Sequence, residues 1–365
     1  MRSLLAAAVG VAAALSHHVA AAPRVDTLYS APGSIAAFAQ DGQLVSWFST
    51  RSKGCNVVYV RSVANGITTT LPEQGRSPNV TCVWRVGDTP VRLAAAGNRV
   101  AWTLRQQEPI PFDYLLGAST ASRKERRFQE FAHTKRGVGL WLGGITGDGD
   151  TLVYGIASVD YVDEAGCLAG TGSCALRTTG GGVYRMIGRQ TPKLLPGTAA
   201  AGAVMVSASS GAVAYVPSSS VAKDGRPAAG ADLPIEIVDA TTGDSIARAM
   251  PQGIPLAISL TGSLLAALER TSSETRIAWY DRATGTARGS VAVPPETTPL
   301  VTANDHAVVF RVGRSIRAVD VATSKIRVLA TAPALPIGLS LEGNRLAWAE
   351  NLKGTGRIRA LVLAS

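Results

Sequence analysis

The sequence predicts an all-β chain in which a four-stranded antiparallel sheet recurs seven times. Two stretches suggest it first, AAAGNRVAWT at 94–103 and LEGNRLAWAE at 341–350. Each joins a Gly-Asn-Arg turn to an alternating apolar run that contains Trp. The composition agrees, because only 17% of the 365 residues are charged, whereas Gly (38) and Pro (19) are plentiful. Many turns and few charges favour strands over helices.

The alternating run occurs at seven places along the chain. Aligned on the aromatic position, the copies place these residues in register: Trp47, Trp102, Tyr154, Tyr215, Ala267, Phe310 and Trp348. The fifth copy has Ala where an aromatic residue is expected. The shortest spacing is 38 residues, from Phe310 to Trp348, and the longest is 61, from Tyr154 to Tyr215. Periods of this size with sheet patterning are typical of ring-shaped sheet repeats.

A second hairpin follows each first one, and it is clearest at 235–250, 277–293 and 316–332. Each of these hairpins has an Asp at the start of its turn, where the carboxylate can accept backbone N–H bonds. These residues are Asp239, Asp281 and Asp320. Two hairpins make one four-stranded sheet.

The seventh copy is incomplete, because only one more strand, 357–363, follows Trp348. The segment RVDTLYSAPG from Arg24 resembles KIRVLATAPA from Lys325, an outer strand of the sixth copy. We therefore expect the N-terminal strand to complete the last sheet and close the ring, which removes a sheet edge. The prediction is a seven-bladed β-propeller of four-stranded blades, with residues 22–365 as a single domain. An open solenoid is the alternative.

Segments such as 341–348 resemble the Asp-Gly-x-x-Ile-Ala-Phe core of WD40-like repeats, as found in the propeller domain of TolB-type periplasmic proteins. The resemblance covers the chain blade by blade through a short motif. The Gly-His and Trp-Asp signatures of true WD40 repeats are missing. The resemblance implies a fold that serves chiefly as a protein-interaction platform, and it assigns no functional residue.

The first 21 residues have the form of a secretory signal peptide. Arg2 is followed by an Ala-rich apolar run, 4–15, and by the small-residue exit Val19-Ala20-Ala21. The run is too short for a good membrane anchor, and no later stretch is apolar for long enough to cross a bilayer. We expect cleavage after Ala21 and a secreted or periplasmic protein. A buried N-terminal helix is the alternative interpretation.

The net charge of +10 could favour anionic envelope polymers, lipid headgroups or nucleic acid. The basic residues are scattered, however, and no basic stretch is interleaved with aromatic residues as in single-strand binders. The densest run, Arg123 to Arg127, aligns with an outer hairpin, where Lys and Arg discourage edge-to-edge pairing. We therefore expect a monomer without a nucleic-acid partner.

Three insertions lengthen the first four repeats. Residues 72–90 follow the outer strand of blade one, whereas 158–182 and 217–234 separate the second and third strands of blades three and four. Because adjacent strands are antiparallel, these two kinds of connection emerge on the same face of a propeller. We call it the loop face.

The four cysteines fall on the predicted loop face. Cys55 and Cys82 belong to blade one, and Cys167 and Cys174 lie inside the blade-three insertion. In an oxidising compartment we expect two disulfides, Cys55–Cys82 and Cys167–Cys174. Zinc ligation is the alternative, but no Cys-x-x-Cys spacing occurs.

The sequence contains few of the residue patterns that are typical of catalytic sites. Only His133 and His306 follow the signal peptide, and no Gly-x-Ser-x-Gly elbow occurs. The segment Asp148-Gly149-Asp150 has oxygen ligands that suit calcium, but its alignment with the other turns favours an ordinary hairpin turn. We expect no catalytic residue, no metal and no cofactor.

The candidate binding residues lie on the loop face. Trp84 and Tyr161 are the expected aromatic anchors, and Asp160, Asp163 and Glu164 form an acidic group beside Tyr161. The hypothesis is an exported, non-enzymatic module that binds a protein or a cell-envelope polymer through the loops of blades one to four. The alternative is a glycosidase or lyase that uses acidic residues near the central channel, and a carboxylate-lined channel mouth would favour it.

Overall fold

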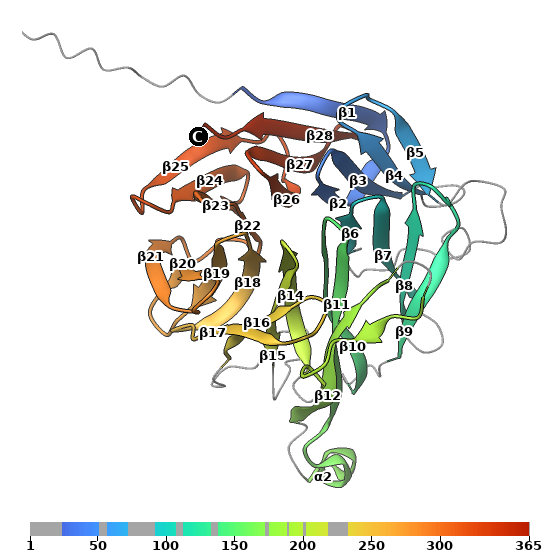
Figure 1. Ribbon diagram of the computed structural model, residues 1–365, viewed down its shortest axis with the longest axis vertical. Coiled ribbons are helices and arrows are strands. Elements are labelled where there is room, and N and C mark those ends of the chain that lie inside the picture. Colours follow the sequence, from blue (N-terminus) through green and yellow to red (C-terminus); the bar gives the residue numbers. More distant parts are fainter. Residues whose placement is uncertain are drawn as a thin grey trace, which may run out of the picture.

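The computed structural model describes residues 24–50, 57–71, 92–106, 112–132, 138–171, 175–187, 190–199, 202–217 and 233–364. In these residues the chain forms seven four-stranded antiparallel sheets arranged as blades around a central axis (Figure 1). The predicted seven-bladed β-propeller is confirmed. The expected signal peptide, residues 1–21, lies outside the described residues.

The innermost strand of each blade faces the axis, where seven strands converge and space is short. In blade three this crowding requires glycine, because a Cβ on Gly147 would lie 2.2 Å from the carbonyl oxygen of Ala95 in blade two. From blade one to blade seven the inner strands are β2 (Ser34–Asp41), β6 (Leu93–Ala96), β10 (Gly139–Asp148), β14 (Ala203–Ser209), β18 (Ile254–Leu260), β22 (Val301–Ala303) and β26 (Ile337–Glu342).

The second strands carry the aligned aromatic position, which is the fourth residue of every one of them. All seven residues at this position are buried, with Tyr215 the most exposed at 5%. Blade five has Ala267 there, and its aromatic residues Trp279 and Tyr280 lie one strand further out. The second strands are β3 (Leu44–Thr50), β7 (Arg99–Gln106), β11 (Thr151–Tyr161), β15 (Ala212–Pro217), β19 (Leu264–Arg270), β23 (Ala307–Val312) and β27 (Arg345–Leu352).

The third and outer strands form the hairpins with the predicted Asp turns. The third strands are β4 (Val57–Ser62), β8 (Phe112–Ser119), β12 (Leu176–Arg185), β16 (Ile235–Asp239), β20 (Thr275–Asp281), β24 (Ser315–Asp320) and β28 (Thr355–Val362). The outer strands are β5 (Thr68–Leu71), β9 (Arg126–Ala132), β13 (Lys193–Leu194), β17 (Ser245–Ala249), β21 (Ala287–Val293), β25 (Ile326–Thr331) and, for blade seven, β1 (Asp26–Pro32). In blade four, for example, the Asp239 carboxylate accepts the backbone N–H groups of Thr241 and Thr242.

The N-terminal strand closes the ring as predicted. Strand β1 pairs antiparallel with β28, from Asp26 opposite Ala360 to Pro32 opposite Thr355. Its Tyr29 also packs against Trp47 of blade one, with ring centroids 4.5 Å apart. The first strand therefore joins blade seven by backbone hydrogen bonds and touches blade one through a side chain.

The core lies between neighbouring blades, where the faces of successive sheets pack together. Trp102, for instance, packs in one apolar cluster with residues of both blade one and blade two. Among the residues described, no helix is long and apolar enough to cross a membrane.

Candidate functional site

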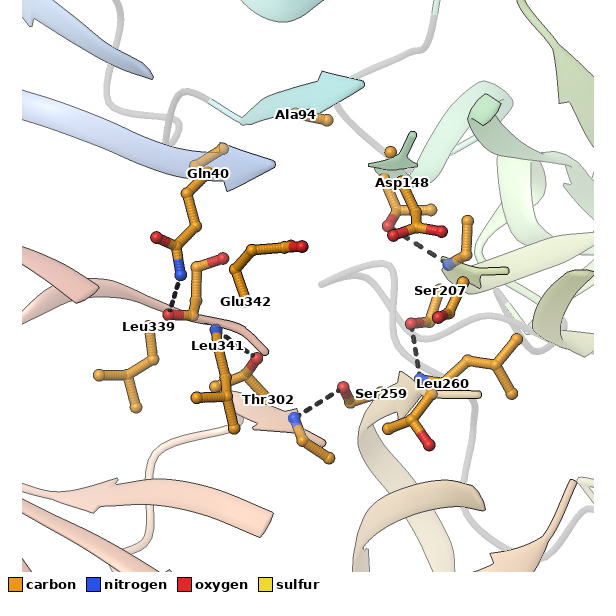
Figure 2. A pocket seen from close by; sticks show the side chains of 18 of the residues that line it. Gln40, Ala94, Asp148, Ser207, Ser259, Leu260, Thr302, Leu339, Leu341 and Glu342 are labelled. Atoms are coloured by element: carbon orange, nitrogen blue, oxygen red, sulfur yellow. Dashed lines mark hydrogen bonds between the residues drawn. The ribbon is translucent and has the colours of Figure 1, made fainter. Parts of the chain in front are cut away.

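A cavity of about 490 Å³ lies on the axis, walled by residues from the inner strands of all seven blades. Its wall consists of the ends of these strands that lead into the first hairpin turns. Figure 2 shows its polar lining, including Gln40, Ser207, Thr302 and the carboxylates of Asp148 and Glu342. The first hairpin turns and the second-to-third-strand connections leave opposite ends of antiparallel strands. The cavity mouth therefore lies on the face opposite the loop face, and we call this the turn face.

A series of hydroxyl groups joins neighbouring inner strands around the cavity. Neighbouring inner strands belong to different sheets and do not pair with each other through their backbones. The N–H groups that they direct toward the axis therefore need other acceptors. Four successive blades use Ser or Thr for this purpose (Figure 2). The bonds run from Ala208 N to Thr146 Oγ1 (3.4 Å), Leu260 N to Ser207 Oγ (2.9 Å), Ala303 N to Ser259 Oγ (3.0 Å) and Leu341 N to Thr302 Oγ1 (2.9 Å).

Three carboxylates meet at the cavity mouth, Asp41 of blade one, Asp148 of blade three and Glu342 of blade seven. One oxygen of each lies within 4.8 Å of the others. Burial raises the pKa of Glu342, and the neighbouring carboxylates add to the increase. Burial likewise raises the pKa of Asp148, although the backbone N–H of Ser210 opposes it. In the described part of the chain, these are the residues whose oxygens could hold a hard cation such as calcium.

Two of these carboxylates also join turns from different blades. Asp41 accepts the backbone N–H groups of Gly97 in blade two and of Gly149 in blade three, the second at 3.1 Å. Asp148 accepts the N–H of Ser210 in blade four at 2.6 Å. Residues 148–150 form the predicted hairpin turn, in which Gly149 has a φ of +58°. These hydrogen bonds between adjacent turns explain why a carboxylate occurs at both positions.

A carboxylate-lined mouth is present, as the glycosidase alternative would require. Two of its three carboxylates, Asp41 and Asp148, accept backbone N–H groups from turns of other blades. These hydrogen bonds favour a role in holding turns over general acid–base chemistry.

The blade-three insertion differs from the loop expected at 158–182. Strands β11 and β12 extend past the ring, and Ser158 pairs with Gly180, Asp160 with Arg177 and Tyr161 with Leu176. A one-turn helix, α2 (Glu164–Ala169), caps the two strands beyond the ring (Figure 1). Much of the insertion is therefore a continuation of the second hairpin of the blade. Backbone pairing between strands stabilises it, where we expected loop structure.

The structure gives most of the predicted acidic group a local role. Asp163 is the N-cap of α2 and accepts the N–H of Gly166 at 2.9 Å, and Glu164 lies in the first helical turn. Asp160 accepts the N–H of Tyr161 at 2.7 Å. Tyr161 is buried, with 8% of its surface exposed, and its role as an aromatic anchor stays a prediction.

The remaining predicted residues divide between described and undescribed segments. Trp84, Cys55, Cys82 and Cys174 lie outside the described residues, as does His133. Cys167 lies in α2, is buried and is not a free cysteine. The pairings Cys55–Cys82 and Cys167–Cys174 stay predictions, which peptide mapping without reduction can test. His306 is exposed in a hairpin turn, as expected.

Comparison with solved structures agrees with the architecture. The chain is similar to the β-propeller domain of the Trilobed protease from Pyrococcus furiosus, with 10% identity, a TM-score of 0.52, and 91% of this chain and 96% of that chain covered. It is similarly related to a chain of the Mitotic Checkpoint Complex, with 13% identity, a TM-score of 0.52, and 97% and 98% covered. The shared fold is the β-propeller.

At identities this low, the structural similarity shows the fold of this propeller and nothing about its partners. TolB from Acinetobacter baumannii is a more distant match, with 14% identity, a TM-score of 0.39, and 72% of this chain and 55% of that chain covered. No model of a protein family matches the sequence, and no curated protein is similar to it. The fold-level resemblance to WD40-like and TolB-type propellers is confirmed.

Proposed function

We propose that this propeller is an exported, non-enzymatic binding module that contacts a protein partner through the loop face of blades one to four. The observation that carries the proposal is the end of the blade-three insertion, residues 160–171, which we call the blade-three tip. Extended strands position it beyond the ring, and the N-cap bond of Asp163 fixes its short helix. A surface that is ordered before binding loses less entropy when the partner arrives.

The blade-three tip exposes apolar side chains next to acidic ones. Val162 is 54% exposed and Leu168 is 61% exposed, on either side of the start of α2. Fully burying an exposed Val or Leu is worth about 1.5–3 kcal/mol, so covering the part of each side chain that is still exposed contributes about 1–2 kcal/mol. Singly exposed apolar residues are common on protein surfaces. Here both belong to one projecting, structured tip, which is the surface that we propose for contact.

Charge indicates the chemistry of the partner. The tip contains Asp160, Asp163 and Glu164 and no Lys or Arg, on a chain whose net charge is +10. An anionic envelope polymer would be attracted to the rest of the chain and repelled by the tip, whereas a basic protein surface with apolar residues complements it. We therefore place a basic, partly apolar protein segment at the blade-three tip.

The experiment compares two double variants in capture from an envelope extract. Val162→Ser/Leu168→Ser removes the apolar contacts of the tip, and the matched control Met250→Ser/Val362→Ser alters two equally exposed apolar residues elsewhere (52% and 68%). A partner retained by the wild type and the control, and reduced about tenfold or more with the tip variant, supports the proposal. Equal capture by all three proteins contradicts it.

Identifying the captured material separates the remaining possibilities. A captured protein should be basic, and its binding should weaken as the salt concentration rises, because charge attraction is screened. If an anionic polymer is retained by wild type and tip variant alike, the partner lies elsewhere on the propeller. Export is tested separately, by sequencing the N-terminus of protein collected outside the cytoplasm. We expect that N-terminus to begin directly after Ala21.

A further inference from the structure

A second cavity, of about 460 Å³, lies between blades two and three and belongs to neither the axial site nor the blade-three tip. It opens on the turn face, beside the second hairpin turn of blade two. Its floor is apolar, formed by Val100 and Phe128 of blade two and by Leu152 and Met186 of blade three. Gly117 keeps the floor compact, because a Cβ there would lie 2.4 Å from the Phe128 ring.

The rim of this cavity carries an excess of positive charge. Arg99, Lys124 and Arg126 line it together with one acidic residue, Glu125. The Arg99 guanidinium donates to the carbonyl oxygens of Met186, at 2.7 Å, and Asp150, which fixes it beside the floor. Arg126 lies over the Phe128 ring, 5.7 Å from its centroid.

The basic run at 123–127 is therefore more than a solvated hairpin. Its outer-hairpin position is confirmed, since the run spans the turn before β9 and the start of that strand. Lys124 and Arg126 line the cavity, whereas Arg127 pairs with Glu130 at 3.2 Å and is not part of the lining. Neighbouring residues of a strand point to opposite faces of its sheet, which separates Arg126 from Arg127.

We propose that this cavity binds a small amphipathic monocarboxylate. Its apolar chain contacts the floor, and its carboxylate lies at the rim between Lys124 and Arg126. The volume falls within the roughly 300–1,000 Å³ of small-molecule sites, which typically combine an apolar wall with a few placed polar groups. Guanidinium and ammonium groups form charge-assisted hydrogen bonds with a carboxylate. The proposal does not depend on the protein partner at the blade-three tip.

Titration calorimetry on the mature protein with straight-chain carboxylates tests the proposal. We expect saturable binding of octanoate, with affinity rising about fourfold for each added CH₂ from butanoate to octanoate. Octan-1-ol, which has the same chain without the charge, should bind about tenfold more weakly or worse. No saturation below about 10 mM octanoate, an affinity independent of chain length, or equal binding of the alcohol overturns the proposal.

Variants of neighbouring residues locate the site. Lys124→Ala/Arg126→Ala should reduce octanoate affinity about tenfold or more, whereas the matched control Arg127→Ala should change it less than about twofold. Equal losses in both proteins show that only general charge was measured, and the proposal fails. Because Lys124 is exposed, Lys124→Glu by itself should leave the fold intact and still weaken octanoate binding, and unchanged binding in that variant also overturns the proposal.

Discussion

A buried ion pair in blade five offers a sharp test of how the structure is stabilised. Glu269 in β19 is fully buried and faces Arg276 in β20 across the strand pair. Its Oε2 accepts hydrogen bonds from Arg276 Nε at 3.1 Å and from a terminal guanidinium nitrogen at 2.9 Å. Its Oε1 accepts the O–H of Tyr280, whose pKa is raised by burial and by the nearby carboxylate. Tyr280 therefore remains a donor at neutral pH.

Replacing Arg276 by Met keeps much of the side-chain volume and leaves the Glu269 carboxylate buried without its counter-charge. Removing one partner of a buried ion pair typically costs about 3–5 kcal/mol. Unfolding entropy is about 2.1 cal/mol/K per residue near the transition, or about 0.7 kcal/mol/K for a ring of about 340 residues. We therefore expect Arg276→Met to lower the Tm by about 4–7 °C.

Thermal unfolding followed by circular dichroism at pH 7 measures this shift. Arg270→Met is the matched control, because Arg270 is exposed on the neighbouring strand and its loss should change stability by no more than about 0.5 kcal/mol. In the double variant Glu269→Gln/Arg276→Met, the uncompensated charge is gone and Gln can still accept the Tyr280 O–H. It should recover at least half of the lost stability. An Arg276→Met protein that melts within about 1 °C of wild type would refute the reasoning.

Three further changes test the axis and the closure. Glu342→Gln should raise the Tm at pH 7 by on the order of 1 °C. The folded-state pKa of Glu342 is raised, so the wild type loses stability as pH rises from about 4.3, the value in the unfolded chain, through that folded-state pKa. The gain of Glu342→Gln over the wild type should therefore vanish in melts below about pH 4, where the wild-type carboxyl is protonated in both states. The same change at exposed Glu296 should do nothing, and equal effects would mean that the environment of Glu342 is irrelevant. Gly147→Ala forces a Cβ against a backbone oxygen and should cost about 1–3 kcal/mol in chemical unfolding, whereas Gly180→Ala, with open space around it, should stay within about 0.5 kcal/mol. Deleting β1 should expose the edge of blade seven, lower the Tm and promote aggregation in size-exclusion runs, and an unchanged melt would argue against closure by this strand.

The sequence alone predicts the architecture of this propeller, because its signals are local and repeated. An alternating run after a turn specifies a half-buried hairpin at each copy, and seven copies confirm one another even where Ala267 replaces an aromatic residue. The missing outer strand of the last copy and its match near Arg24 were enough to predict closure, which β1 and β28 confirm. Each of these inferences needs only a short window of sequence or a comparison between windows.

The fine structure of the insertion was harder to predict. The segment 158–182 contains Gly-rich stretches that indicate a loop, yet cross-strand pairing extends β11 and β12 into it. The acidic residues around Tyr161 suggested a binding surface, and the structure adds local roles: Asp160 and Asp163 accept backbone N–H groups, and Glu164 lies in the first turn of a helix. Local capping and a ligand site use the same residue types, so the sequence by itself does not separate them.

The meeting of distant side chains was decided only by the tertiary structure. Asp41, Asp148 and Glu342 each belong to an ordinary turn in sequence, and they come together because inner strands from blades one, three and seven converge on one axis. Glu269 and Glu350 occupy the same position in their second strands, and both are fully buried. Glu269 has Arg276 and Tyr280 as hydrogen-bond donors. Beside Glu350, by contrast, a guanidinium nitrogen of Arg359 lies 3.8 Å from the carboxylate oxygen Oε1. Local pattern specifies each strand and turn, but which charges meet depends on how the ring brings distant strands together.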